Sequence, residues 1–61
     1  MPIVQIDMIE GRTVEQKREM VKKITAAICE TASCPAEAVT IIIRDAAKHH
    51  IAKAGILMLD K

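Results

Sequence analysis

The chain contains no phenylalanine, tyrosine or tryptophan. It therefore lacks the aromatic platforms on which single-strand nucleic-acid binders stack bases. The formal net charge is only +1, with both signs interspersed, so no basic surface for nucleic acid is expected either. No apolar run approaches the roughly 20 residues of a membrane-spanning helix, and no signal-peptide pattern precedes the first apolar segment. These absences predict a cytoplasmic protein that binds neither nucleic acid nor membrane.

Cysteine is also scarce, because Cys29 and Cys34 are the only two in the chain. They are too few and too close in sequence to hold a small fold together, and they do not form a CxxC pair. A zinc site would have to recruit His49 and His50 as well. We therefore expect two reduced, packed cysteines and no metal, and we interpret the two histidines as polar loop or interface residues rather than an acid–base pair.

The chain is short, yet half of it is apolar. Its 61 residues allow one domain, spanning residues 1–61, and 51% of them are hydrophobic. A chain of this size buries only about 60% of the surface that its unfolded form exposes. Small scaffolds without disulfides or metal usually depend on partner subunits, so the composition predicts an oligomer.

The first apolar segment, residues 2–9, has the β-branched density of a strand buried on most of both faces. Pro2 can open this strand because a first residue need not donate to the ladder. Processing normally removes a methionine that precedes proline, so the mature chain would begin with a secondary amine. Such an amine titrates near ~8 when unperturbed, and an apolar wall with a nearby cation would make it a general base.

A helix is predicted to follow the turn at Glu10-Gly11-Arg12. Thr13 fits an N-cap, and Gln16 three residues later completes a capping box. The apolar spacing then continues at helical period until Ser33, because Pro35 disfavours helical geometry at Cys34. Glu19 precedes Lys23 by four residues, which predicts a solvent-facing ion pair.

A second strand is predicted at residues 39–44, after a short turn at residues 35–37. Strand, helix and strand then form an α/β fold, a βαβ unit with parallel strands. Residues 46–53 fit a short helical turn or a loop. Gly55 opens a last short β segment at residues 56–59, which we expect to pair with a neighbouring subunit in the oligomer.

This pattern resembles the 4-oxalocrotonate tautomerase family. The matching residues are Pro2-Ile3, Gln5-Ile6, Glu10-Gly11-Arg12, Glu15-Gln16-Lys17, Val39, Ile42-Ile43, Ala47-Lys48 and His50. The resemblance implies a homohexamer built as a trimer of βαβ dimers. It also implies a cofactor-independent isomerase that moves a proton between oxygen and carbon of an enol or dienol carboxylic acid.

The resemblance also implies roles for individual residues. Pro2 is the catalytic base once Met1 is removed, and Arg12 is the cation that binds carboxylate charge and lowers the pKa of the amine. Thr40 and Ile51 occupy the family's substrate-binding positions. Keto–enol tautomerisation independently requires both a base and positive charge near the developing oxyanion.

The departures from the family pattern concern the substrate. Thr40 stands where the family has a second arginine, and Arg44 lies about 13 Å further along the same strand face. Ile51 replaces an aromatic residue, and Ala54-Gly55 replaces a pair of glycines. Lys48 and Lys53 add positive charge near these positions. We therefore expect altered activity toward 2-hydroxymuconate and better turnover of a monocarboxylate enol such as phenylenolpyruvate.

Two other readings of the sequence remain open. A ribbon-helix-helix DNA-binding dimer has a similar size, but it needs two helices after one basic strand, and here Gln5 and Asp7 are the outward candidates. The chain also fits a weakly active or inactive family member that serves as a structural subunit or assembles with a paralogous chain carrying the missing arginine.

Overall fold

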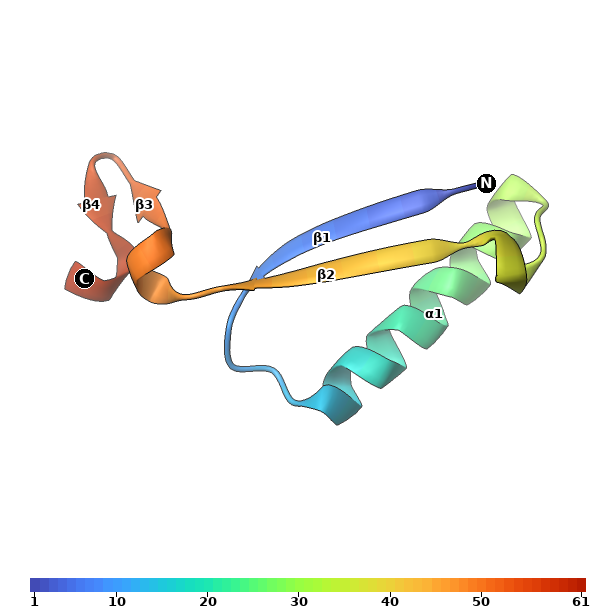
Figure 1. Cartoon of the computed structure of the whole chain (residues 1–61), viewed down its shortest axis with the longest axis horizontal. Coiled ribbons are helices and arrows are strands. Elements are labelled where there is room, and N and C mark those ends of the chain that lie inside the picture. Colours follow the sequence, from blue (N-terminus) through green and yellow to red (C-terminus); the bar gives the residue numbers. More distant parts are fainter.

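A computed structural model describes all 61 residues as a βαβ unit followed by a small C-terminal arm, residues 47–61 (Figure 1). Short 3-10 turns at Ala36–Ala38, Lys48–His50 and Met58–Asp60 connect or end the main elements. Those elements are β1 (Ile3–Ile9), α1 (Val14–Ala32), β2 (Thr40–Ala46), β3 (Ala52–Lys53) and β4 (Ile56–Leu57).

The first two strands are parallel, as the sequence predicted. Their register runs from Ile3 opposite Thr40 to Ile9 opposite Ala46. Parallel strands require a long crossover, and α1 supplies it. The second apolar run is thus a strand and not a helix, which excludes the ribbon-helix-helix arrangement.

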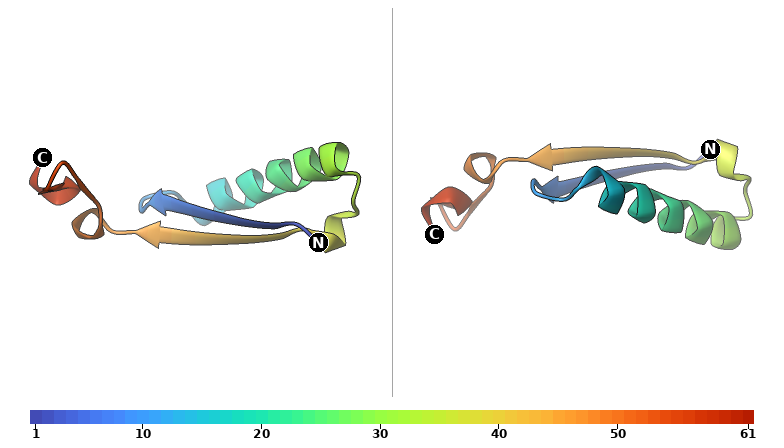
Figure 2. Two further views of the ribbon diagram at one scale, coloured as in Figure 1. Left: turned by 90° about the horizontal axis from the view of Figure 1, so that it is seen from above. Right: turned by 90° about the horizontal axis from the view of Figure 1, so that it is seen from below.

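The β1–β2 sheet is covered by α1 on one face only (Figure 2). On that face the side chains are half-buried: Val4, Ile6, Met8, Ile41 and Ile43. The opposite face, which we call the open sheet face, carries Ile3, Gln5, Asp7, Thr40, Ile42 and Arg44, all exposed. The prediction of a strand covered on both faces is therefore wrong for a single chain, because nothing in the chain packs against the open sheet face.

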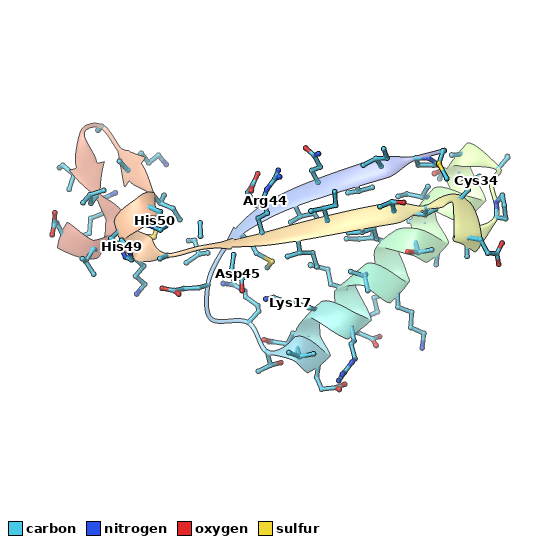
Figure 3. The ribbon with its side chains drawn as sticks, viewed as in Figure 1. Lys17, Cys34, Arg44, Asp45, His49 and His50 are labelled. Carbon is cyan, nitrogen blue, oxygen red and sulfur yellow. The ribbon has the colours of Figure 1, made fainter.

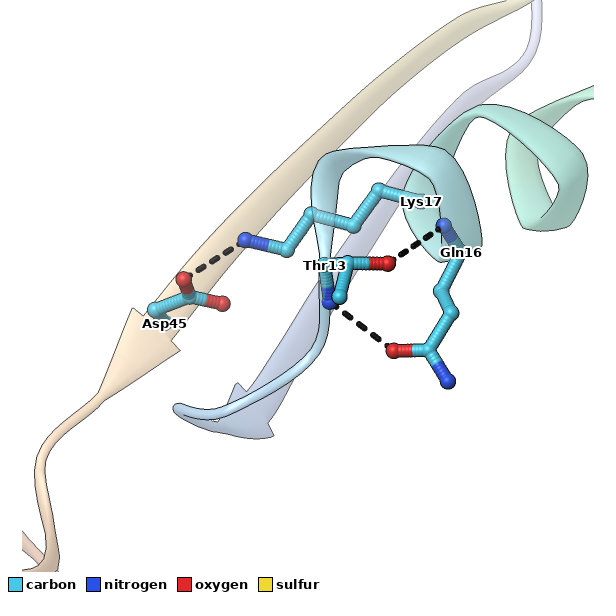
Figure 4. Close-up of polar contacts among 4 residues, drawn as sticks. All are labelled: Thr13, Gln16, Lys17 and Asp45. Atoms are coloured by element: carbon cyan, nitrogen blue, oxygen red, sulfur yellow. Dashed lines mark hydrogen bonds and ion pairs between the residues drawn. The ribbon is translucent and has the colours of Figure 1, made fainter.

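Helix α1 begins with the predicted capping box (Figure 4). The Thr13 hydroxyl accepts from the Gln16 N–H at 3.1 Å, and Gln16 Oε1 accepts from the Thr13 N–H at 2.8 Å. One residue further on, Lys17 reaches across to β2, where its Nζ lies 2.6 Å from Asp45 Oδ2. The helix ends at Ala32, and Ser33 takes a left-handed conformation with φ 54°. The start of α1 is thereby fixed against the end of β2.

The arm is a β-hairpin that projects beyond the end of β2, away from α1 (Figures 1 and 2). Strands β3 and β4 pair antiparallel around Ala54 and Gly55, whose φ values are 53° and 80°. Positive φ at both central residues is the type I′ geometry favoured in two-residue hairpins. The last β segment thus pairs within its own chain, and it is shorter than predicted because Met58–Asp60 turns into a 3-10 helix. The expectation that it lacks a partner within its own chain is therefore wrong, whereas its pairing with a neighbouring subunit stays a prediction.

The isolated chain has no buried core. None of its residues is fully buried, and its accessible surface is 4779 Å², whereas a compact monomer of this mass exposes about 3,900 Å². Its radius of gyration is 14.8 Å, against about 10.5 Å for a compact domain of this length. No helix is long and apolar enough to cross a membrane. Such an extended chain, with an uncovered sheet face, exposes surface of the kind that subunits of an oligomer normally bury.

Candidate active site

Pro2 and Thr40 lie together at the amino ends of the two parallel strands. The carbonyl of Pro2 accepts a hydrogen bond from the Thr40 N–H at 3.0 Å, and the next residue, Ile3, is the register partner of Thr40. Pro2 is half-buried, whereas Met1 before it is 93% exposed. The ladder therefore fixes the backbone of Pro2 directly beside that of Thr40.

Arg12 and Ile51 lie at the other end of the sheet. β1 has 7 residues, so at ~3.3 Å per step its two ends lie about 20 Å apart. Arg12 follows the end of β1 through Gly11, whose φ of 123° only glycine adopts easily. Ile51 follows the end of β2, where the arm begins (Figure 1). Because the strands are parallel, a single chain does not bring Arg12 or Ile51 to Pro2.

Of the three arginines, only Arg12 has no acidic partner. Arg18 pairs with Glu15 one helical turn away. Arg44 Nε lies 3.0 Å from Asp7 Oδ1 across the open sheet face (Figure 3). The guanidinium of Arg44 is therefore already engaged by a carboxylate of its own chain.

The two histidines lie on the arm, in the 3-10 turn after β2 (Figure 3). The rings of His49 and His50 meet edge to face with centroids 4.1 Å apart, and both side chains are exposed. Neither makes a side-chain hydrogen bond to a carboxylate that would orient it as a base. No group of three or more histidine, cysteine or acidic residues is placed to hold a metal ion.

The cysteines meet at the carboxyl end of α1. Both are free thiols and half-buried. The left-handed Ser33 reverses the chain, which brings Cys34 back toward the last turn of the helix and Cys29. Desolvation by surrounding atoms, and then the neighbouring Cys34, raise the pKa of the Cys29 thiol. A raised pKa lowers the thiolate fraction, so this thiol is a weak nucleophile.

The arm forms an open pocket of about 350 Å³, which we call the arm cavity. This volume lies within the usual range of small-molecule sites. Its lining is four hydrophobic residues and two lysines: Ile51, Ala52, Lys53, Ile56, Met58 and Lys61. Sequence reasoning singled out Ile51 and Lys53 but missed the pocket. The available signal was Gly55, which permits the tight turn that folds residues 51–53 onto residues 56–58.

Comparison with known proteins identifies the family. Residues 2–60 match the model of the tautomerase enzyme family. A 2-hydroxymuconate tautomerase of Bacillus subtilis is 43% identical over 60 residues, covering 98% of this chain and 97% of its own length. A probable tautomerase of Bacillus cereus is 43% identical over the full length of both chains.

Solved structures agree with this assignment. YwhB, a homologue of 4-oxalocrotonate tautomerase, superposes with a TM-score of 0.93 at 42% identity, covering 98% of both chains. A chain of the heterohexameric 4-oxalocrotonate tautomerase from Chloroflexus aurantiacus gives a TM-score of 0.90 at 33% identity, covering 98% of this chain and 97% of its own. The resemblance predicted from the sequence is confirmed: the chain belongs to the tautomerase family and is an isomerase of the 4-oxalocrotonate tautomerase type.

Proposed function

We propose that the protein is a cofactor-independent keto–enol tautomerase acting on an enol or dienol carboxylic acid, with Pro2 as the general base after removal of Met1. The observation that carries this proposal is the position of Pro2. The match to the family begins at this residue, and its carbonyl is held in the β1–β2 ladder by Thr40. Without Met1, the ring nitrogen would be a free amine one residue before β1. With Met1 present, the same nitrogen is part of a peptide bond.

The chemistry needs only a proton carrier and a cation. The neutral amine of Pro2 takes the proton of the enol hydroxyl as the C=O double bond forms. The resulting ammonium then returns a proton to the substrate carbon that receives the displaced electron pair. Arg12 would neutralise the charge on the carboxylate and on the oxygen during this transfer. Its own charge would also favour the neutral form of the amine.

The site would be composite, because Pro2 and Arg12 lie at opposite ends of β1. Pro2 and Thr40 of one copy would meet Arg12 and Ile51 contributed by other copies. The uncovered sheet face and the two open edges of the β1–β2 sheet support such an assembly, since unpaired strand edges and exposed apolar surface are normally covered. We propose that this assembly is a homohexamer built as a trimer of βαβ dimers.

Substrate choice follows from Thr40. Its hydroxyl accepts and donates hydrogen bonds but cannot form the paired, charge-assisted contact of an arginine with a second carboxylate. We therefore propose that a monocarboxylate enol such as phenylenolpyruvate is turned over better than the dicarboxylate 2-hydroxymuconate.

The test is ketonisation of both substrates, followed by ultraviolet absorbance, with protein whose intact mass confirms the loss of Met1. Pro2→Ala should reduce kcat/KM by about 100-fold or more, the usual contribution of a general base. Protein that retains Met1 is the matched control, because it keeps the proline ring but not its amine, and it should be equally impaired. Full activity in either preparation would refute the proline-base mechanism.

A second candidate function is that of a partner-dependent subunit. Thr40 carries no charge, and the relative from Chloroflexus aurantiacus is described as a heterohexamer. A paralogous chain with an arginine at this position would then complete the site. Native mass spectrometry of protein purified from its own host distinguishes the two proposed assemblies. A single subunit mass supports the homo-oligomer, whereas two subunit masses support the mixed assembly.

A further inference from the structure

The hairpin of the arm gathers its apolar and basic side chains on one face. The Met58 N–H donates to the Ile51 carbonyl at 2.8 Å, and Lys53 is the register partner of Ile56. Directly opposed residues of an antiparallel pair share a face, and so do residues two apart along a strand. Ile51, Lys53, Ile56 and Met58 therefore form one wall of the arm cavity.

The charged side chains that line this cavity are both lysines. Lys53 and Lys61 contribute them, and none of the lining side chains is acidic. Neither lysine belongs to any of the ion pairs in the chain, which use Lys17, Arg18, Lys23 and Arg44. An apolar floor flanked by unpaired ammonium groups is complementary to an organic anion, meaning a carboxylate attached to an apolar body.

The arm cavity also contains a residue of the proposed substrate site. Ile51 lines it beside Lys53, and both Ile51 and Arg12 follow the carboxyl ends of the parallel strands. We propose that the arm cavity receives the single carboxylate of the substrate and that Lys53, assisted by Lys61, binds it together with Arg12. This inference rests on the proposed function, and it assigns Lys53 a role in substrate binding and specificity.

In this proposal, the arm of one copy contributes to the site around the Pro2 of another copy. Within one chain the arm lies beyond the carboxyl end of β2, whereas Pro2 lies at the amino end of β1 (Figure 1). Lysine also differs from arginine as an anion partner, since it is a point charge on a flexible stem and lacks the planar fork that binds a carboxylate through two bonds. Two mobile ammonium groups fit a substrate with one carboxylate and an apolar remainder.

The first test measures binding without turnover. Isothermal titration of the oligomer lacking Met1 uses trans-cinnamate as a carboxylate probe and cinnamamide as its neutral isostere. Lys53→Gln should weaken cinnamate binding about 2- to 5-fold, the size expected for one exposed charge contact, and leave cinnamamide unchanged. The double variant Lys53→Gln/Lys61→Gln should weaken it further. Lys22→Gln, which removes an unpaired lysine from α1, is the matched control and should bind as wild type.

The second test separates this inference from the proposed function. With phenylenolpyruvate, Lys53→Gln should raise KM by a similar factor and leave kcat nearly unchanged, whereas Pro2→Ala abolishes kcat. Equal cinnamate affinity in wild type and the double variant would overturn the role of the lysines even if Pro2-dependent activity stands. Lysine-dependent cinnamate binding without any tautomerase activity would keep the carboxylate site and refute the proposed reaction.

A third outcome concerns another occupant of the cavity. If a side chain of a neighbouring copy fills it in the oligomer, neither probe will bind there. The double variant will then change the native mass or the thermal stability of the assembly. That result would overturn the proposal and assign the arm cavity to subunit packing.

Discussion

At the scale of single residues, Arg12 is distinguished by what it does not contact. It is exposed, has no acidic partner, and is held after the end of β1 by a glycine with positive φ. A free guanidinium in a constrained turn keeps its full capacity to bind a carboxylate from another molecule, whereas Arg44 already uses part of this capacity on Asp7.

Arg12→Ala should therefore lower kcat/KM for phenylenolpyruvate by about 10- to 100-fold, the value of a lost hydrogen bond to a charged group. KM should rise because carboxylate binding is lost, and kcat should fall because the developing oxyanion is less stabilised. The acidic limb of the pH profile of kcat/KM should move to higher pH, since removal of the cation raises the pKa of the amine. Arg18→Ala, which removes an arginine paired on the helix surface, is the control. Unchanged kinetics in Arg12→Ala would eliminate its role in the site.

At the scale of elements, the turn of the arm carries a local strain. Ala54 has a φ of 53°, a conformation that costs a residue with a Cβ about 1 kcal/mol or more. Ala54→Gly should relieve this strain and, after the added freedom of the unfolded chain is subtracted, stabilise the hairpin by about 0.5–1 kcal/mol. The midpoint of thermal unfolding should rise accordingly. Ala52→Gly, in β3 where φ is negative, should lower it, and a lower midpoint in Ala54→Gly would show that the turn is not strained.

The elements differ in how well their sequences determine them. Thr13 and Gln16 cap α1 through local hydrogen bonds, and Pro35 limits it from the other end, so both boundaries were predictable. The β-branched run before Arg44 specified β2 but not its extension to Ala46, which depends on pairing with Ile9. The Ala52–Lys53 strand has no β propensity of its own. It forms because the type I′ turn folds it onto β4, and the arm cavity depends on that same turn.

The candidate site was predictable in its parts but not in its geometry. The strand-opening position of Pro2 and the glycine before Arg12 are visible in the sequence. Their separation at opposite ends of β1 follows from the topology, because parallel strands place their amino ends together and their carboxyl ends together. Lys53 was interpreted as added surface charge, since only the register of the hairpin shows that it shares a face with Ile51.

At the scale of the whole molecule, the proposed oligomer gives the absence of a core and the division of the site the same cause. In that assembly, a chain with an open sheet face and a projecting arm would complete both its packing and its catalytic set by contact with other copies. Pro2→Ala and Arg12→Ala then remove residues that different chains contribute to each site. An oligomer that contains both variants will hold some sites with an intact Pro2 from one chain and an intact Arg12 from another.

Mixing these two inactive variants should therefore restore activity. If equal amounts are unfolded together and refolded, random assembly leaves about a quarter of the sites with both residues intact, because each contributing subunit is the suitable one in half of the cases. Activity toward phenylenolpyruvate should approach that fraction of wild type, whereas each variant refolded alone stays inactive. Mixing without unfolding is the control for subunit exchange. If refolded mixtures with the native mass of the oligomer stay inactive, Pro2 and Arg12 act from the same chain, and the extended form of the subunit must change on assembly.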